Sequence, residues 1–310
     1  MKGWTSLSST PTGAAALLLA AMIGAVSALP ACSEEVRHEH LGLALLANLE
    51  GADAKPAAEA PLALIVHGTL AHHGMEVIKT LQAGLKERGL SSLAITLSLG
   101  LDARRGMLGC GLEHDHRASD AAEEIAAWVG WLKDRGRQAI ALIGHSRGAQ
   151  QVAHYAVGAP DQRIERLVLI APLADPPEAH VRRYAATFAG DLPHLLAAAR
   201  KHVTDGEEDT VMEVPGFLNC RNARVTAAAF LDYYDPEPAR SALELAARVQ
   251  RPILIIAAGA DEISPDLAAR AHPPPGPHTS LEIVDGADHF FRDLFADDLA
   301  DKVAAFLRQR

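Results

Sequence analysis

The sequence is poor in aromatic residues, in cysteine and in basic side chains. Aromatic residues make up 5% of the chain, which leaves few platforms on which nucleic-acid bases can stack. The 29 Lys and Arg residues are outnumbered by 39 Asp and Glu residues, so the net charge is −10. The basic surface that attracts nucleic acid or anionic lipid is therefore missing. We expect no nucleic-acid partner and interpret the acidity as an aid to solubility.

Long hydrophobic runs are also scarce. The longest run covers residues 14–29 and follows a polar start that carries Lys2. It is shorter than the roughly 18 apolar residues that a transmembrane helix needs, and it has the length of a signal-peptide core. We expect residues 1–31 to be a signal peptide, so that the protein is exported to the periplasm or to the cell exterior.

The end of this segment allows two kinds of processing. Val26, Ser27 and Ala28 form a small-residue site at which a secreted protein can be cut. The LPAC run at 29–32 instead resembles a bacterial lipobox, which would make Cys32 a lipidated N-terminus. Both possibilities stay open, and a lipid on Cys32 is the one membrane contact that we expect.

Two further cysteines, Cys110 and Cys220, remain in the exported chain. Export favours a disulfide, but neither cysteine lies in an obvious core strand, so a bridge and two free thiols both stay open. His114 and His116 are two residues apart, but no third metal ligand lies nearby in the sequence. We expect no metal and treat these two histidines as solvated loop residues.

The composition that remains is that of a globular protein. Hydrophobic residues make up 49% of the 310 residues and charged residues 22%, which excludes a disordered or collagen-like chain. From residue 61, short apolar runs alternate with amphipathic stretches. Continuous apolar runs of this length are typical of strands buried on both faces of a parallel sheet. The predicted strands are 62–66, 92–97, 139–143, 167–170, 253–257 and 281–284.

Helical periodicity fills the intervals between these strands, at 75–88, 119–133 and 292–307. The alternation predicts an α/β fold with a doubly wound, mostly parallel sheet over residues 61–310. The interval 175–249 is longer than one crossover and contains helical stretches, so we expect a helical cap inserted there. Residues 32–60 look like a lead-in, with a helix at 41–49 and an Ala-rich linker at 51–60.

One sequence motif is typical of a catalytic site. GHSRG at 144–148 follows the strand 139–143 and opens a helical stretch, which is the context of a G-x-S-x-G nucleophile turn. The glycines permit the sharp turn, and the turn presents Ser146 at the carboxyl end of the sheet. A serine needs a base to become nucleophilic, so an acid and a histidine should follow along the chain.

Candidates for both partners follow later strands. Asp261 comes just after the strand 253–257, and His289 lies in the loop between the strand 281–284 and the last helix. With Ser146 they lie at one edge of the sheet, where open α/β sheets place their sites. Asp175, after the strand 167–170, is a rival for the acid, and Glu262 stands beside Asp261.

Four sequence features together resemble the α/β-hydrolase superfamily. They are His67-Gly68 after the first strand, GHSRG, the G-A-D-x-x-x-P stretch at 259–265 and the GADH stretch at 286–289. The resemblance implies an acyl-transfer enzyme in which Ser146 is the nucleophile, His289 the general base and Asp261 the acid that orients it. It also implies an oxyanion hole made by the backbone N–H groups of Arg147 and Thr69, in a loop shaped by hydrogen bonds from His67. We expect the segment 102–117 to line the entrance.

From these residues we expect an exported serine hydrolase that cleaves small-molecule carboxylic esters or thioesters without a cofactor. The alternatives are an acyltransferase on the same fold and a catalytically silent, envelope-associated binding module. The Arg147 side chain either meets an acidic group of the substrate or packs on its helix. Aromatic residues of the inserted segment, such as Tyr184, Phe188 and Tyr234, either line an acyl pocket or pack the cap.

Overall fold

The computed structural model describes residues 33–51, 60–158, 161–235 and 241–309. The predicted signal peptide at 1–31 and the candidate lipidation site Cys32 lie outside the described residues, as does most of the predicted linker. Within the described residues, no helix combines the length and the apolar character that a membrane span requires.

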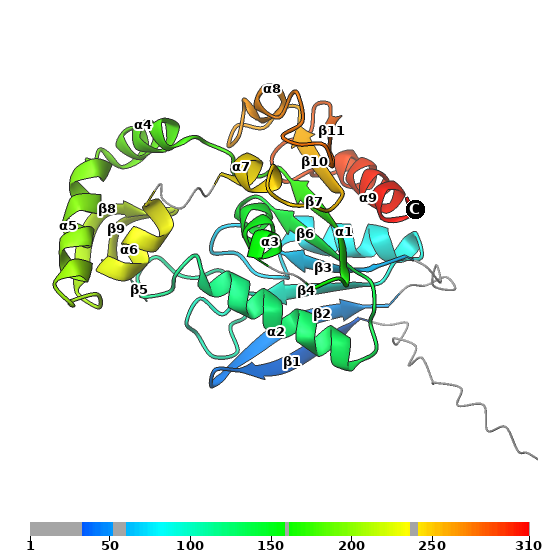
Figure 1. Ribbon diagram of the computed structural model, residues 1–310, viewed down its shortest axis with the longest axis horizontal. Coiled ribbons are helices and arrows are strands. Elements are labelled where there is room, and N and C mark those ends of the chain that lie inside the picture. The colour runs from blue at the N-terminus through cyan, green and yellow to red at the C-terminus, as the bar shows by residue number, and fades with distance from the viewer. Residues whose placement is uncertain (1–32, 52–59, 159–160, 236–240, 310) are drawn as a thin grey trace, which may run out of the picture.

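An eight-stranded sheet forms the centre of the molecule, with the order β1-β2-β4-β3-β6-β7-β10-β11 (Figure 1). All neighbours from β4 to β11 are parallel, as the buried apolar runs predict. The predicted doubly wound α/β fold is therefore confirmed. The parallel strands are β3 (Leu62–Val66), β4 (Ser92–Thr96), β6 (Ile140–His145), β7 (Ile164–Ile170), β10 (Ile253–Ala258) and β11 (Thr279–Val284).

The N-terminal part of the sheet differs from the prediction. A hairpin of β1 (Glu34–His40) and β2 (Leu43–Glu50) adds two antiparallel strands beside β4, so the helix expected at 41–49 is wrong. The turn explains the difference. Leu41 and Gly42 both have positive φ angles, 48° and 82°, which is the two-residue turn that suits the twist of a hairpin.

Helices cover both faces of the sheet. Alternate residues of β3 face opposite sides, so that Leu64 belongs to one apolar cluster and Ile65 to the other. Side chains of α2 (Asp120–Asp134) and α3 (Arg147–Gly158) complete the cluster of Leu64. Those of α1 (Glu76–Glu87) and α9 (Leu294–Leu307) complete the other. The short helix α8 (Leu267–Arg270) follows β10.

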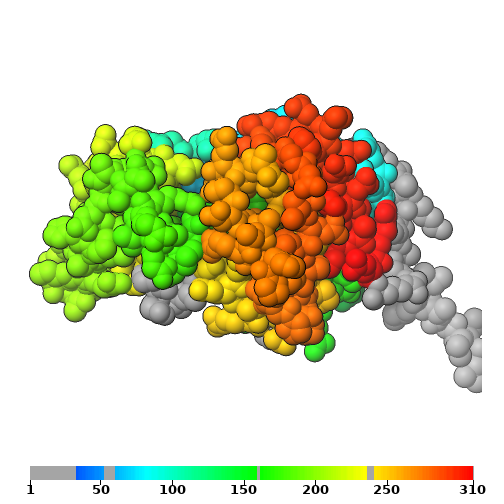
Figure 2. Space-filling model, turned by 90° about the horizontal axis from the view of Figure 1, so that it is seen from above, coloured from blue at the N-terminus to red at the C-terminus, as the bar shows by residue number. Residues whose placement is uncertain are grey.

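A lobe between β7 and β10, which we call the cap, lies beside one end of the sheet (Figures 1 and 2). It contains α4 (Pro177–Phe188), α5 (Leu192–Thr204), β8 (Val211–Phe217), β9 (Cys220–Thr226) and α6 (Ala227–Tyr234). After it, α7 (Ala242–Ala246) packs on α3. The helical interval expected here also holds an antiparallel pair of strands, β8 and β9, that the sequence did not predict.

The segment after β4 is tied to the cap in two ways. Cys110 and Cys220 form a disulfide with a Cα–Cα distance of 5.2 Å, which closes the question of free thiols. Three residues beyond Cys110, the short strand β5 (Glu113–His114) pairs with β9 in a three-stranded sheet. The cap is therefore bonded to the core covalently and through backbone hydrogen bonds.

Candidate active site

Ser146 stands alone between β6 and α3, at the carboxyl end of the sheet. Its φ angle is +56°, and its N–H donates to the Ile170 carbonyl at 2.8 Å, which fixes the turn. A Cβ on Gly144 would lie 2.3 Å from the Gly148 backbone, and one on Gly148 would lie 2.4 Å from the Val66 carbonyl oxygen. The two glycines of the motif are thus required by close backbone packing, and the strained serine is held by its surroundings.

His289 and Asp261 meet after the last two strands. His289 Nδ1 lies 2.8 Å from Asp261 Oδ2, and both side chains are buried. The N–H groups of Ile263 and Ser264 donate to Asp261 Oδ1 at 2.7 and 2.8 Å. Burial alone raises the pKa of the Asp261 carboxyl, but the bonds from His289 and from the two N–H groups outweigh it and hold the pKa below the usual range. The ionised carboxylate accepts a hydrogen bond from the Nδ1–H group, which leaves Nε2 as the basic nitrogen of the ring.

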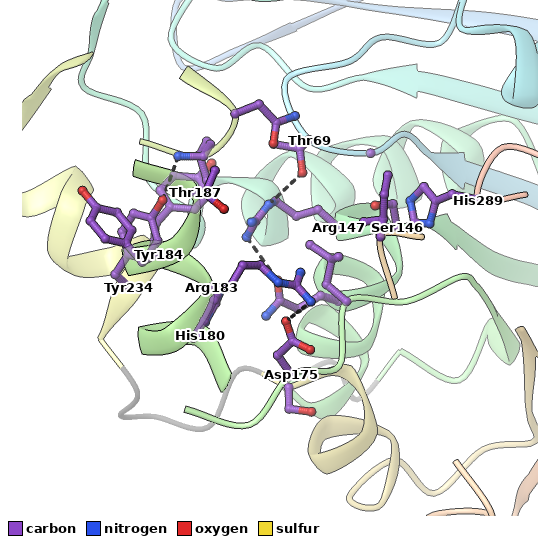
Figure 3. Close-up of a pocket in the computed structure, with 18 of the residues that line it drawn as sticks. Thr69, Ser146, Arg147, Asp175, His180, Arg183, Tyr184, Thr187, Tyr234 and His289 are labelled. Atoms are coloured by element: carbon purple, nitrogen blue, oxygen red, sulfur yellow. Dashed lines mark hydrogen bonds and ion pairs between the residues drawn. The ribbon is translucent and has the colours of Figure 1, made fainter. Parts of the chain in front are cut away.

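Ser146 and His289 line the same pocket, and Figure 3 places them at one end of it. Asp175 lies apart from His289 in Figure 3. It pairs instead with Arg183 at 2.5 Å and with Arg270 at 3.3 Å. Of the two acids expected from the sequence, the structure brings Asp261 to the histidine.

The loop after β3 lies directly against Ser146. A Cβ on Gly68 would be 3.2 Å from the Ser146 Cβ. The ring of His67 holds this loop, because its Nε2 accepts the Leu97 N–H at 3.1 Å and its Nδ1 therefore donates to the Gly68 carbonyl at 2.8 Å. Burial, together with the nearby Arg104, lowers the pKa of His67 to about 3, so the ring is neutral.

Thr69 and Arg147, the candidates for the oxyanion hole, are in contact. The Arg147 guanidinium donates to the Thr69 hydroxyl at 3.1 Å (Figure 3) and lies 5.5 Å from the centre of the Tyr233 ring. Both residues line the pocket together with Ser146. Two backbone N–H groups beside a nucleophile are the arrangement that stabilises an oxyanion.

The pocket has a volume of about 780 Å³ and extends from Ser146 into the cap. Its size falls within the range of small-molecule sites. The cap supplies much of the apolar wall through Val181, Tyr184, Phe188, Leu192, Leu196 and Tyr234. By contrast, Phe217 and Phe230 are fully buried and pack inside the cap. Of the aromatic residues of the cap, Tyr184, Phe188 and Tyr234 therefore line the pocket, whereas Phe217 and Phe230 stabilise the cap itself.

The segment 102–117 differs from the expectation that it lines the entrance with solvated histidines. Met107 alone among its described residues lines the pocket. His114 and His116 are buried, with 3.3 Å between their nearest ring nitrogens, and His116 Nδ1 lies 3.0 Å from the Tyr233 hydroxyl. The prediction that these histidines are solvated is wrong. No cluster of three or more potential metal ligands occurs among the described residues.

Glu124 on α2 is a second buried acid that sequence patterns did not single out. Its carboxylate accepts the Ser98 N–H at 2.8 Å and the Ser98 hydroxyl at 2.6 Å. Burial raises the pKa of Glu124 to about 7, against the opposing effect of these bonds. The sequence of α2 contains several acids, and its helical spacing does not distinguish Glu124 from the others. Glu124 is buried because it contacts Ser98, which follows β4 and is distant in the sequence.

This raised pKa predicts a pH-dependent stability. The folded chain keeps the Glu124 proton to a higher pH than the unfolded chain, in which the group titrates near its ordinary value of 4.5. Stability from this group is therefore complete below that value and is lost as the pH rises through about 7. Between about pH 5 and about pH 8, we expect wild type to lose roughly 2–4 kcal/mol of unfolding free energy that Glu124→Gln keeps.

Urea unfolding at several pH values measures this difference. The neighbouring acid Glu123 is exposed on the same helix, so Glu123→Gln is a matched control that should follow wild type. Parallel stability profiles for wild type and Glu124→Gln would contradict the raised pKa.

Most of the sequence matches a known protein family. A model of the alpha/beta hydrolase family matches residues 63–306. No curated protein matches the chain significantly.

Many solved structures are similar to this chain at low sequence identity. Est1E from Butyrivibrio proteoclasticus, solved with bound ferulic acid, is 20% identical, with a TM-score of 0.62 over 88% of this chain and 97% of that one. The esterase domain of a Rhodothermus marinus protein is 19% identical, with a TM-score of 0.57 over 89% and 98%. A thioesterase domain from the curacin biosynthetic pathway is 15% identical, with a TM-score of 0.55 over 90% and 100%. At these identities the likeness shows the fold alone.

Proposed function

The chain belongs to the alpha/beta hydrolase family, and we propose that it is a serine hydrolase that cleaves carboxylic esters or thioesters through an acyl-serine intermediate. The observation that carries the proposal is the joint position of Ser146 and His289 in one pocket, with the His289 ring held by the buried Asp261 carboxylate. The esterase domain and the thioesterase domain among the structural neighbours support the same class of chemistry.

In the proposed reaction, Ser146 Oγ attacks the carbonyl carbon while His289 Nε2 takes the hydroxyl proton. The negative charge that develops on the carbonyl oxygen is stabilised by the N–H groups of Arg147 and Thr69. Asp261 stabilises the imidazolium ion and keeps Nδ1 protonated. The imidazolium then protonates the leaving alcohol or thiol, and a water activated by His289 releases the acid from Ser146. These steps use no cofactor.

The direct test is product analysis with the purified protein. A panel of p-nitrophenyl esters and acyl thioesters is offered with and without an alcohol acceptor, and the released acid is quantified. We expect free acid in the absence of the acceptor. Acyl transfer that requires the acceptor would indicate an acyltransferase instead. A folded protein that neither releases acid nor transfers an acyl group would contradict the enzymatic proposal and favour a binding module.

We also propose that the protein is exported. The apolar segment at 14–29 and the Cys110–Cys220 bridge support this location, because disulfides persist in oxidising compartments. Mass spectrometry of the N-terminal peptide of the mature protein tests the proposal. A chain that starts at Leu29 would indicate simple secretion, and a lipidated Cys32 would indicate a membrane anchor. An uncut chain that still starts at Met1 would overturn the proposal.

A further inference from the structure

Arg104 is a deeply buried arginine near the pocket, although its side chain does not line it. It is 6% exposed, whereas the next residue, Arg105, lies at the surface and pairs with Glu35 at 2.6 Å. Three donors of the Arg104 guanidinium point to backbone carbonyls, those of Leu97 at 2.8 Å, of Ala71 at 2.6 Å and of Gly106. Burial of a charged group is costly unless such partners compensate it.

The carbonyl of Ala71 belongs to the loop that carries Thr69. The Ala71 N–H donates to the Gly68 carbonyl at 3.2 Å, which closes a turn around Thr69 and Leu70. Within that turn Leu70 has a φ angle of +54°, a conformation that a leucine adopts only when its surroundings impose it. The position of the Thr69 N–H therefore depends on contacts that hold the turn.

The same short segment supplies a second contact to the turn. Four residues after Arg104, the Leu108 N–H donates to the Leu70 carbonyl at 2.9 Å. Arg104 also reaches the other end of the loop, because its Nη2 lies 3.3 Å from Nε2 of His67. Two residues beyond Leu108, Cys110 is bonded to the cap. The segment 104–110 thus makes two hydrogen bonds to the Thr69 turn, and the segment is itself held by the buried Arg104 side chain and by the Cys110 disulfide.

From these contacts we infer that Arg104 is a positioning residue for the oxyanion hole. By holding the Ala71 carbonyl and the ring of His67, it fixes the turn that aims the Thr69 N–H at the developing oxyanion of the Ser146 reaction. The inference rests on the proposed function and adds to it a residue that touches neither substrate nor reacting atoms.

Arg104→Met tests the inference, because methionine fills part of the space and donates no hydrogen bond. We expect kcat for a p-nitrophenyl ester to fall about 10- to 100-fold while KM stays within about threefold, since the oxyanion forms only after the substrate is bound. Phenylboronic acid, which forms a tetrahedral adduct with an activated serine, should lose affinity by a similar factor. Arg104→Lys, which keeps the charge and a donor, should recover part of both losses.

Arg105→Met is the matched control and should behave as wild type, because Arg105 is exposed. Circular dichroism and the unfolding midpoint establish that each variant is folded. A folded Arg104→Met with kcat and boronate affinity within about twofold of wild type would overturn the inference. A rise in KM with unchanged kcat would overturn it as well, because that pattern indicates a role in substrate binding alone.

The remaining outcomes are also decisive. If Arg104→Met does not fold, the same two constants are measured on Arg104→Gln, which is polar but cannot reach the Leu97, Ala71 and Gly106 carbonyls together, and wild-type values there overturn the inference. If wild type itself shows no turnover and no boronate binding, the proposed function fails and the inference falls with it. Loss of activity in Arg104→Met alone, with wild type active, leaves the proposed function intact.

Discussion

Ser146→Ala is expected to abolish covalent labelling by a fluorophosphonate probe and to lower ester turnover by about 10⁴-fold or more. The probe reacts only with a serine whose proton is taken by a base, and Ser146 shares its pocket with His289. Alanine removes the oxygen that forms the acyl bond and should leave the turn intact, because the backbone N–H bond to Ile170 does not involve the side chain. Gel fluorescence and initial rates measure both effects.

Ser241→Ala is a matched control for this experiment. Ser241 also lines the pocket, but its hydroxyl donates a hydrogen bond to the Ala174 carbonyl oxygen at 3.1 Å, which is not a base. We expect this variant to be labelled like wild type. Labelling that persists in Ser146→Ala would place the nucleophile elsewhere. A folded wild type that is never labelled would favour the binding-module alternative over catalysis.

The parts of the molecule that follow local rules were predictable from the sequence. Strands such as Leu62–Val66 are continuous apolar runs because both faces of the parallel sheet are covered. The turn that bears Ser146 has a local signature, because Gly144 and Gly148 are demanded by backbone contacts within the turn and with the neighbouring strand. Its place in the site follows from the general rule that such sheets carry their sites at the carboxyl edge.

The parts that depend on distant partners were not predictable. Residues 43–50 fit both a helix and a strand by composition, and the Leu41–Gly42 turn decides for the strand. His116 is buried because its ring packs against Tyr233, which lies 117 residues away in the sequence and contacts His116 Nδ1 through its hydroxyl group. In the sequence, Arg104 cannot be distinguished from the adjacent Arg105. Only folding brings the Ala71 and Leu97 carbonyls within hydrogen-bonding distance of Arg104. Polar side chains of this kind can be buried because partners distant in the sequence form hydrogen bonds with them, and no local sequence pattern predicts those partners.

Asp261→Asn is the second change with a large expected effect. We expect kcat to fall by about 10⁴-fold, because an amide neither stabilises the imidazolium ion nor keeps the productive tautomer of His289. The backbone N–H groups of Ile263 and Ser264 still find an acceptor in the asparagine side-chain oxygen, so the loop should keep its shape. Steady-state kinetics of the folded variant measures the loss.

Two neighbouring acids give this prediction its controls. Glu262→Gln changes an exposed carboxylate one residue away, and it should keep turnover near that of wild type. Asp175→Asn breaks ion pairs with Arg183 and Arg270, so it should affect stability more than kcat. If Asp175→Asn instead lost about 10⁴-fold in kcat while Asp261→Asn stayed active, Asp175 would be the acid that orients His289. A large loss of kcat confined to Asp261→Asn would instead mean that catalysis requires the hydrogen bond at His289 Nδ1, since Asp261 is the acid that makes this bond.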